Sequence, residues 1–306
     1  MDRYRKLSKY LKEKYGTRVH KIPLSAGFTC PNRDGTISKG GCIFCDPSGS
    51  GFATLGPNIP IEEQVSRMIE RAERRFKAEK FIVYFQAYSN TYGTPDKLEK
   101  LYKSALVDPR IVELDVSTRP DLLPEEVIDV FDKLKKEIDL TVEIGLQTVN
   151  YKTLKILNRG HTLSEFIDAV VRLKKRSFNV VSHVILNLPW DDMEDVVETA
   201  KILSALNVDG VKLHSLYVVK NTKLAEMFLN NEVKICSVHE YVERVITFLE
   251  YLSPEIIIHR LVADPPKEGT IFGNWGMKKQ DIVRIIEEEM EKRDSFQGKK
   301  YNYLRR

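Results

Sequence analysis

The sequence predicts an α/β fold, namely a partial (β/α)6 TIM-like barrel with a small C-terminal extension. Three observations predict it. Strand-like segments rich in Val and Ile alternate with amphipathic helical segments, the strands recur about every thirty to forty residues, and polar residues directly follow several strands. Such alternation is typical of parallel βαβ units with right-handed crossovers, which gather functional residues at the carboxyl ends of their strands.

The chain divides into three predicted regions: a basic N-terminal helix in 1–16, the barrel in 17–220 and an α/β extension in 221–306. The six barrel strands are expected at 17–28, 80–86, 111–118, 140–147, 179–187 and 209–218. The helices between them are expected at 61–78, 95–106, 124–136, 163–176 and 191–205. The extension is expected to hold a short segment at 222–229, helices at 237–251 and 278–292, and a strand at 256–262.

The composition is that of a globular protein, with 306 residues, 42% of them hydrophobic and 30% charged. This length is enough to bury a sizeable core in one large domain. No apolar run reaches the length of a signal peptide or of the roughly 20 residues that span a membrane. We therefore expect a cytoplasmic protein without membrane contact. The net charge of +4 is too mild to demand a nucleic-acid partner.

Positive charge is concentrated at both ends of the chain. The first 21 residues carry eight Lys or Arg against two acidic residues, with Tyr4, Tyr10 and Tyr15 between them, and residues 3–15 have helical periodicity. The tail 299–306 is also basic and aromatic. These segments suggest a face that binds RNA phosphates and stacks bases on tyrosine. The alternative is a solvated basic helix that packs beside the barrel.

Three of the four cysteines, Cys30, Cys42 and Cys45, fall within sixteen residues, and Cys236 lies far away. This grouping does not suit a secreted disulfide framework and points to one metal centre. A structural zinc site takes four ligands, and the nearest histidine, His20, lies ten residues upstream. Three thiolates can hold three irons of a [4Fe–4S] cube and leave the fourth iron open. A zinc ribbon or a redox pair remains the alternative for an isolated C-x-x-C.

The pattern Cys30-x11-Cys42-x2-Cys45, with Phe44 before the last cysteine, resembles the cluster loop of radical S-adenosylmethionine (SAM) enzymes. Most members have three residues in the first gap, and longer gaps occur in the branch that includes the catalytic subunit of elongator. The chain resembles an uncharacterised bacterial group of that branch over nearly its whole length. The resemblance implies that the open iron binds SAM, and that an electron, supplied by a reductant such as flavodoxin or ferredoxin, cleaves SAM to a 5′-deoxyadenosyl radical that abstracts hydrogen from the substrate.

The resemblance also implies SAM contacts at the ends of the second and third strands. Gln86 lies where the family usually has a glycine-rich turn that meets the SAM amino group, and this sequence has no glycine there. Ser117 matches a SAM-contacting position in the relatives, which include oxygen-independent coproporphyrinogen oxidase. The alternatives are an ordinary loop around Gln86 and a capping or loop role for Ser117.

Further SAM contacts are implied at the fourth and fifth strands. Gln147 matches a ribose contact and Arg159 matches the partner of the SAM carboxylate, a role that suits the two parallel donors of a guanidinium. His183 lies where relatives place an acidic ribose contact, with core packing as the alternative, and Ile185 where an apolar residue packs on adenine.

Two residues beyond these are candidates for contact with substrate. His214, on the sixth strand, either faces the barrel interior or packs in the core. Arg260 either reaches a substrate phosphate or is an ordinary surface charge.

The sequence thus predicts a radical SAM enzyme, with tRNA as its expected partner and a modified wobble-uridine side chain as its substrate. One alternative is a radical SAM enzyme that acts on a small metabolite. Another is a non-enzymatic RNA-binding protein that is stapled by a metal site. Dinucleotide-binding, P-loop and serine-nucleophile motifs are absent from the sequence.

Overall fold

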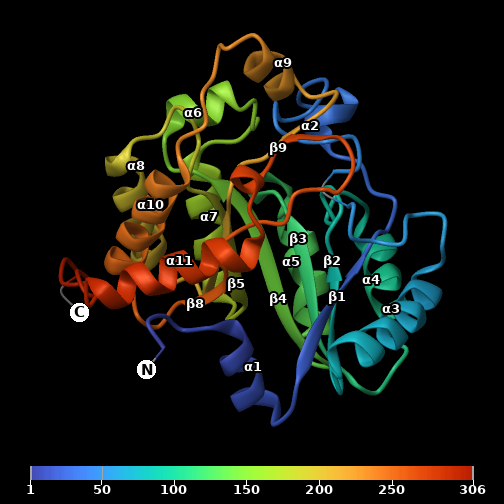
Figure 1. The fold of residues 1–306 in the computed structure, drawn as a ribbon. Helices are drawn as coiled ribbons and strands as arrows, with labels where there is room; N and C mark the ends of the chain where they lie inside the picture. Colours follow the sequence, from blue (N-terminus) through green and yellow to red (C-terminus); the bar gives the residue numbers. More distant parts are fainter. Residues whose placement is uncertain (1, 50, 305–306) are drawn as a thin grey trace.

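A computed structural model describes residues 2–49 and 51–304. Seven parallel strands form one twisted sheet in the order β1-β2-β3-β4-β5-β6-β8, which curves into an open half-barrel (Figure 1). The strands are β1 (Val19–Leu24), β2 (Lys80–Phe85), β3 (Ile111–Thr118), β4 (Asp139–Gln147), β5 (Asn179–Ile185), β6 (Gly210–His214) and β8 (Ile257–Arg260). Two short strands, β7 (Val218–Val219) and β9 (Thr270–Phe272), pair antiparallel in a separate sheet.

Helices cover the outer face of the half-barrel. The crossover helices are α3 (Ile61–Phe76), α4 (Pro95–Ser104), α5 (Glu125–Leu134), α7 (Leu163–Lys175) and α8 (Met193–Ala205). Each presents buried apolar residues to the strands, as Val65, Ile69 and Ala72 of α3 do. The helix α10 (Val238–Tyr251) packs on α8, and α11 (Lys279–Lys292) packs on α10. The resulting core fills the space between the helices and the sheet.

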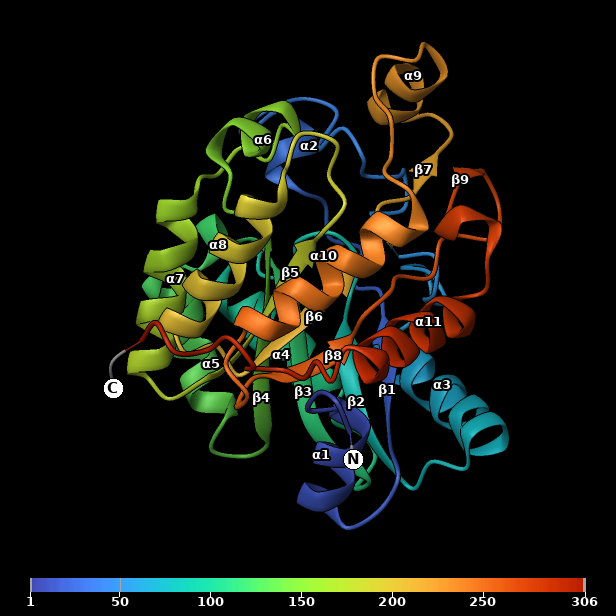
Figure 2. The same cartoon turned by 60° about the vertical axis from the view of Figure 1, so that its left-hand side comes forward.

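A second, smaller hydrophobic cluster lies above the carboxyl ends of the strands. It brings together the segment Cys42–Cys45, the end of α6 (Tyr151–Ile156), α9 (Lys223–Leu229) and the β7–β9 pair. Figure 1 shows α2 (Pro31–Asp34), α6 and α9 at this end of the sheet, and Figure 2 shows the same grouping from another side. The cysteine loop, α9 and the β7–β9 pair form a cap, because apolar side chains from them pack on one another.

The opposite end of the sheet is covered by α1 (Leu7–Tyr15), which contacts both edge strands, β1 and β8. The amide of Ile258 donates to the carbonyl of Arg5 at 2.8 Å, which fixes the start of the helix beside β8. The single-turn helices η1 (Pro120–Leu122) and η2 (Asn274–Gly276) complete the elements. Within residues 2–49 and 51–304, no helix is long and apolar enough to cross a membrane.

The predicted fold class is confirmed, with one more strand in the main sheet than expected. The strand expected at 256–262 is β8, and it pairs with β6. The strand expected at 209–218 ends earlier, at His214, because the Asn187 side chain accepts from the amide of Leu216 at 2.7 Å and turns the chain toward β7. The β7–β9 pair was not predicted, because two- and three-residue strands carry no measurable periodicity.

Candidate functional site

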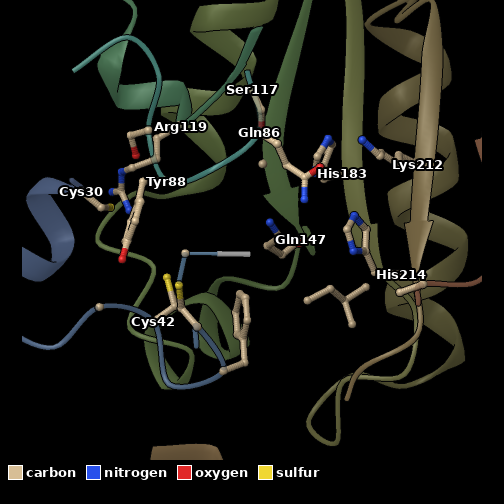
Figure 3. A pocket seen from close by; sticks show the side chains of 18 of the residues that line it. Cys30, Cys42, Gln86, Tyr88, Ser117, Arg119, Gln147, His183, Lys212 and His214 are labelled. Carbon is tan, nitrogen blue, oxygen red and sulfur yellow. The ribbon is translucent and has the colours of Figure 1, made fainter. Parts of the chain in front are cut away.

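A cavity that is open to solvent lies at the carboxyl ends of the strands, under the cap. Figure 3 shows cysteines of the 30–45 loop on one side and strand residues on the other. All nine residues predicted as cluster or SAM contacts line this cavity: Cys30, Cys42, Cys45, Gln86, Ser117, Gln147, Arg159, His183 and Ile185. The nine residues predicted from the sequence therefore line one cavity, whereas the role of each of them is still a proposal.

The cysteine loop is held in shape by an arginine that it contains. Cys30 precedes the short helix α2, and its carbonyl accepts from the amide of Arg33 at 2.8 Å. The Arg33 guanidinium donates to the carbonyls of Cys45 at 2.9 Å and Asp46 at 3.1 Å. The amide of Cys45 in turn donates to the carbonyl of Cys42 at 2.9 Å. One side chain thus joins the first part of the loop to the last.

Two asparagines join this loop to the segment after α6. Asn32, which is fully buried, donates to the carbonyl of Asn158 at 2.5 Å. Asn158 donates back to the carbonyl of Gly41 at 2.9 Å and to Ser38 Oγ at 3.0 Å. Asn158 has a positive φ of 53°, a conformation that asparagine tolerates better than most residues. This exchange fixes the place of Arg159, the next residue, relative to the cysteines.

The three cysteines form a donor set that fits a multi-iron cluster. All three are free thiols, Cys42 is buried, and Cys30 and Cys45 are partly exposed toward the cavity. Burial, reinforced by the neighbouring Cys42, raises the pKa of the Cys45 thiol to about 12. In the described part of the chain, no group of three His, Cys, Asp or Glu side chains is arranged to hold a single metal ion. A cluster places each of its cysteine ligands on a different iron.

A β-bulge directs Gln147 into the cavity. The register between β4 and β5 shifts between Gly145 and Gln147, and Gln147 has a φ of 75°. Bulges commonly re-aim a side chain next to a functional site. Gly145 leaves room beside it, because a Cβ there would lie 3.0 Å from both Gln147 Nε2 and Arg159 Nη2. A side chain at Gly145 would therefore crowd both Gln147 and Arg159.

The turn after β2 carries a second strained residue. Its backbone has a positive φ of 60° at Tyr88, which is uncommon for a bulky side chain and marks a position that the surrounding fold over-determines. The amide of Tyr88 donates to the carbonyl of Gly49 at 3.0 Å, and a Cβ at Gly49 would collide with the Tyr88 ring. The turn therefore places a tyrosine, and not a glycine, at a positive φ.

Two arginines lie near the cysteines. Arg159 donates from Nη1 to Cys42 Sγ at 3.2 Å and from Nη2 to the carbonyl of Gly145 at 2.8 Å. Arg119 pairs through Nε and Nη2 with Asp121, while its buried Nη1 has no partner within the described residues. A buried donor normally has a hydrogen-bond partner, which is either a protein group, an ordered water or a ligand. The site therefore offers unused hydrogen-bonding capacity beside the thiols.

Glu143 of β4 is the centre of a buried charge network beneath the cavity. Its Oε1 accepts from Lys21 Nζ at 2.8 Å, and its Oε2 accepts from Lys212 Nζ at 2.7 Å and lies 2.7 Å from His183 Nε2. Burial alone would raise the pKa of Glu143, but the two lysines hold it well below its usual value. Burial lowers the pKa of His183 to about 4 and that of Lys212 to about 8.

A second buried carboxyl group shares this network. Asp115 pairs with Lys21 and is fully buried, and burial together with the nearby Glu143 charge raises the pKa of Asp115 well above its usual value. Two carboxylates that compete for one cation titrate apart, because their charges repel. Glu143 is therefore the ionised member of the pair. Because Glu143 is an anion, the neutral His183 carries its proton on Nε2 and presents Nδ1 as an acceptor.

Several lining residues were not predicted from the sequence, above all Tyr84 and Lys212, which meet at 3.0 Å inside the barrel. A signal for them was present. In parallel strands with both faces buried, polar residues are expected to be scarce, yet here they recur at every second position, as in Tyr84-x-Gln86 and Lys212-x-His214. Alternate residues share one face, so this spacing identifies the inward-facing side.

The basic N-terminal helix lies at the other end of the barrel from the cavity. Several cations of this segment have partners: Lys14 Nζ pairs with Asp139 at 2.9 Å, and Arg5 pairs with Glu255 at 3.2 Å. The Tyr15 hydroxyl lies 2.8 Å from Asp139. These contacts favour the alternative in which the helix packs beside the barrel, over a face for RNA.

The C-terminal tail is packed in a similar way. Lys300 pairs with Glu250, and the Tyr303 hydroxyl donates to the carbonyl of Tyr251, so both residues lie against α10. Arg305 and Arg306 of the predicted basic tail lie outside the described residues.

Comparison with known protein families gives two matches that together cover most of the chain. Residues 30–203 match the radical SAM superfamily model, and residues 208–292 match the model of the radical SAM C-terminal domain. The first match begins at Cys30 and contains all nine predicted site residues. The second contains β6, β8 and α10, which complete the sheet and cover its last strands.

Individual relatives agree with these matches. The uncharacterized protein YtqA of Bacillus subtilis (strain 168) is 36% identical over 302 residues, which is 99% of this chain and 94% of the relative. The tRNA uridine(34) acetyltransferase of Methanocaldococcus jannaschii is 29% identical over 201 residues, which is 64% of this chain and 36% of that protein. The solved structure of the Methanocaldococcus infernus Elp3 superposes with a TM-score of 0.70 at 21% identity, covering 91% of this chain and 64% of that one.

Proposed function

Because the chain belongs to the radical SAM superfamily, and is thus a radical SAM enzyme, we propose that Cys30, Cys42 and Cys45 hold a [4Fe–4S] cluster and that the adjoining cavity binds SAM. The observation that supports this most strongly is the arrangement of three free cysteines around one cavity at the carboxyl ends of the strands. Family membership also removes the alternative of a non-enzymatic protein stapled by a metal.

The bound cluster and SAM would supply a reducing electron and a 5′-deoxyadenosyl radical that abstracts hydrogen from the substrate. The chain itself positions and encloses the reactants. Arg33 fixes the two halves of the cysteine loop, and the cap covers one end of the cavity. The lumen side is closed by the Glu143 network, in which Lys21 and Lys212 both pair with Glu143.

For SAM we propose contacts from both sides of the cavity. Arg159, whose guanidinium touches Cys42 Sγ, would pair with the SAM carboxylate beside the cysteine loop. Gln147 would contact the ribose, with His183 offering Nδ1 as an acceptor for a ribose hydroxyl. The full set of proposed SAM contacts is Gln86, Ser117, Gln147, Arg159, His183 and Ile185.

For the substrate we propose tRNA, with the radical acting on a modified wobble-uridine side chain. The support is the 29% identity to a protein named as a tRNA uridine(34) acetyltransferase. A small metabolite is the second candidate, because the lumen side of the cavity carries buried charged groups of the kind that bind small polar molecules. The N-terminal segment adds little support for RNA, since several of its cations pair with carboxylates elsewhere in the chain.

Metal analysis tests the cluster. Anaerobically reconstituted protein is expected to contain about four irons and four sulfides per chain. Cys42→Ser should lose most of this iron, whereas the matched variant Cys236→Ser should keep it, because Cys236 lies outside the cavity. Iron retained by Cys42→Ser would contradict the proposed ligand set.

Mass spectrometry of total tRNA tests the substrate. Cells that lack the protein are expected to accumulate a wobble-uridine precursor that wild-type cells convert. The purified protein should bind tRNA with an affinity that falls as salt rises, because phosphate contacts release counterions. An unchanged set of tRNA nucleosides, together with no salt-dependent binding, would favour the small metabolite.

A further inference from the structure

The cavity is lined by an excess of positive charge. Its charged side chains are Arg33, Arg119, Arg159, Lys212, Arg260 and Asp264. Asp264 is the one carboxylate among these lining residues, and it is exposed and paired with Lys279 at 2.8 Å. The lining of the cavity therefore has five cations, and its one carboxylate pairs with none of them.

Four of the five cations have a partner or a proposed task. Arg33 closes the cysteine loop, Arg119 pairs with Asp121, and Arg159 contacts Cys42. Lys212 shares the buried Glu143. Arg260, at the end of β8, differs from them, because it lies within ion-pairing distance of no carboxylate in residues 2–49 and 51–304. Its contacts are with neutral groups, from Nε to the carbonyl of Leu213 at 3.2 Å and from Nη2 to His214.

The negative charge behind this wall does not compensate Arg260. One ionised carboxylate, Glu143, serves both Lys21 and Lys212. The second, Asp115, pairs with Lys21, and its raised pKa reduces its negative charge further. Three cations therefore stand against at most two anions. At least one positive charge on this wall lacks a counter-ion inside the protein.

The wall that carries this charge lies across the cavity from the cysteines. In Figure 3, Cys30 and Cys42 are on one side, while Lys212 and His214 are on the opposite side, on β6. Arg260 belongs to the second side, because it contacts His214 and because β8 pairs with β6. The neighbouring His214 is neutral, because burial, and then the charge of Arg260, lower its pKa well below its usual value.

We propose that Arg260 and Lys212 form an anion subsite that holds a carboxylate or phosphate group of the substrate. The guanidinium keeps Nη1 without a partner in the described part of the chain and suits the two oxygens of either group, while Lys212 adds a point charge. This inference rests on the proposed function, because it assigns the cysteine side to SAM and the β6–β8 side to the substrate. It narrows the substrate class to molecules that carry an anionic group near the reacting carbon.

Titration with simple anions tests the subsite. Inorganic phosphate and acetate are titrated separately by calorimetry into reconstituted protein with SAM bound, at an ionic strength held constant with sodium chloride. The wild type is expected to bind at least one of the two anions, and the tighter one identifies the group. Arg260→Met should weaken this binding by about tenfold or more, as expected for the loss of a charge-assisted hydrogen bond.

A matched arginine serves as the control. Arg67→Met removes an exposed arginine of α3 that pairs with Glu63, far from the cavity, and should leave anion binding unchanged. Arg260→Lys keeps the charge without the fork and should give intermediate binding. Equal anion binding by wild type and Arg260→Met, or binding of neither anion by the wild type, would overturn the proposal.

Competition with SAM gives a readout in the wild type, so the test survives if Arg260→Met does not fold. The anion should bind with SAM present, because the subsite lies across the cavity from the proposed carboxylate partner Arg159. Displacement of the anion by SAM would overturn the proposal, since the anion would then occupy the SAM carboxylate position. No turnover is needed, so anion binding in a protein that does not cleave SAM would refute the proposed function and leave the subsite standing.

Discussion

Glu143 shows how one buried residue holds the interior of the barrel together. It accepts from Lys21 of β1 and from Lys212 of β6, and so ties two strands that lie on opposite sides of β4 in the sheet. A buried ion pair is weak evidence for net stability, but removal of one partner is costly because the other charge stays buried and alone. Substitution of Glu143 and substitution of Asp115 are therefore expected to lower the free energy of unfolding by different amounts.

The first prediction compares these two carboxyl groups. Glu143→Gln should lower the free energy of unfolding by about 3–5 kcal/mol, because two lysines lose their ionised partner. Asp115→Asn should cost clearly less, because the raised pKa of Asp115 already favours its neutral form. Urea unfolding at pH 7 measures both, with the exposed Glu126→Gln as a control expected within about 0.5 kcal/mol of wild type. Equal losses for the two buried variants would refute the assignment of Glu143 as the ionised member.

The second prediction concerns Gly145, where a side chain would crowd two proposed SAM contacts. In Gly145→Ala the new Cβ would force Arg159 and Gln147 to shift by a few tenths of an ångström. The fold and the iron content should survive, while the dissociation constant for SAM should rise by about 3- to 10-fold, which corresponds to one weakened hydrogen bond. Equilibrium dialysis with labelled SAM measures this change.

Gly93→Ala is the matched control, since its Cβ would meet Leu98 and Phe28 at an ordinary 3.4 Å outside the cavity. If Gly145→Ala binds SAM as tightly as this control, the two side chains do not contact SAM as proposed.

At the scale of elements, the segment after β5 joins three helices through Asp191. Thr153 of α6 donates to Asp191 Oδ1 at 2.5 Å, and Arg244 of α10 donates to the Asp191 carbonyl at 2.9 Å. Asp191 lies just before α8, whose capping box uses Asp192. Burial raises the pKa of the Asp191 carboxyl group to about 6, above the value near 4 of an unfolded chain.

The third prediction is a pH dependence that follows from this shift. The folded state binds the Asp191 proton more tightly than the unfolded state, so the stabilising contribution is complete at low pH and is lost as the pH rises through about 6. Asp191→Asn removes this pH-dependent contribution to stability. The stability of the variant relative to wild type should therefore be higher at pH 7.5 than at pH 5, by at most a few kcal/mol. Chemical unfolding at the two pH values measures the difference in the free energy of unfolding between the variant and the wild type. A difference that is the same at both pH values would contradict the raised pKa of the buried Asp191.

The elements that the sequence predicted best are those with strong periodicity. The helix expected at 163–176 is α7, Leu163–Lys175, and its start is fixed by a capping box of Thr162 and Glu165 that is visible in the sequence. The strand expected at 179–187 is β5. The pairing of β8 with β6 was not predictable, because a strand in an apparent extension carries no mark of the partner with which it pairs. Likewise, the charges of the N-terminal segment predicted its basic character, but not that Glu255 would pair with Arg5 and Asp139 with Lys14.

At the scale of the whole molecule, the site arises because distant segments end at the same edge of one sheet. The cysteine loop follows β1, Gln147 ends β4, and Lys212 lies on β6, nearly two hundred positions from Cys30 in sequence. Motif spacing located the cysteine side, since its residues are close in sequence. The Arg260–Lys212 side depends on side chains from different strands, and only their register in the folded sheet brings them together.

The cap and the half-barrel enclose the cavity from two ends. The cap, which contains the cysteine loop and α9, covers the cavity from one end, and the Glu143 network closes it from the lumen. Residues that line the cavity belong to six different strands. This arrangement is the physical basis for proposing that a radical formed beside the cysteines stays shielded until it meets the substrate.

Quantification of 5′-deoxyadenosine tests this account most directly. Protein reconstituted without oxygen and reduced with dithionite is expected to convert SAM to equal amounts of methionine and 5′-deoxyadenosine, and Cys236→Ser should do so as well. Cys42→Ser should form neither product. If the wild-type protein holds its full complement of iron and sulfide, binds SAM, and still releases no 5′-deoxyadenosine, the central claim is contradicted.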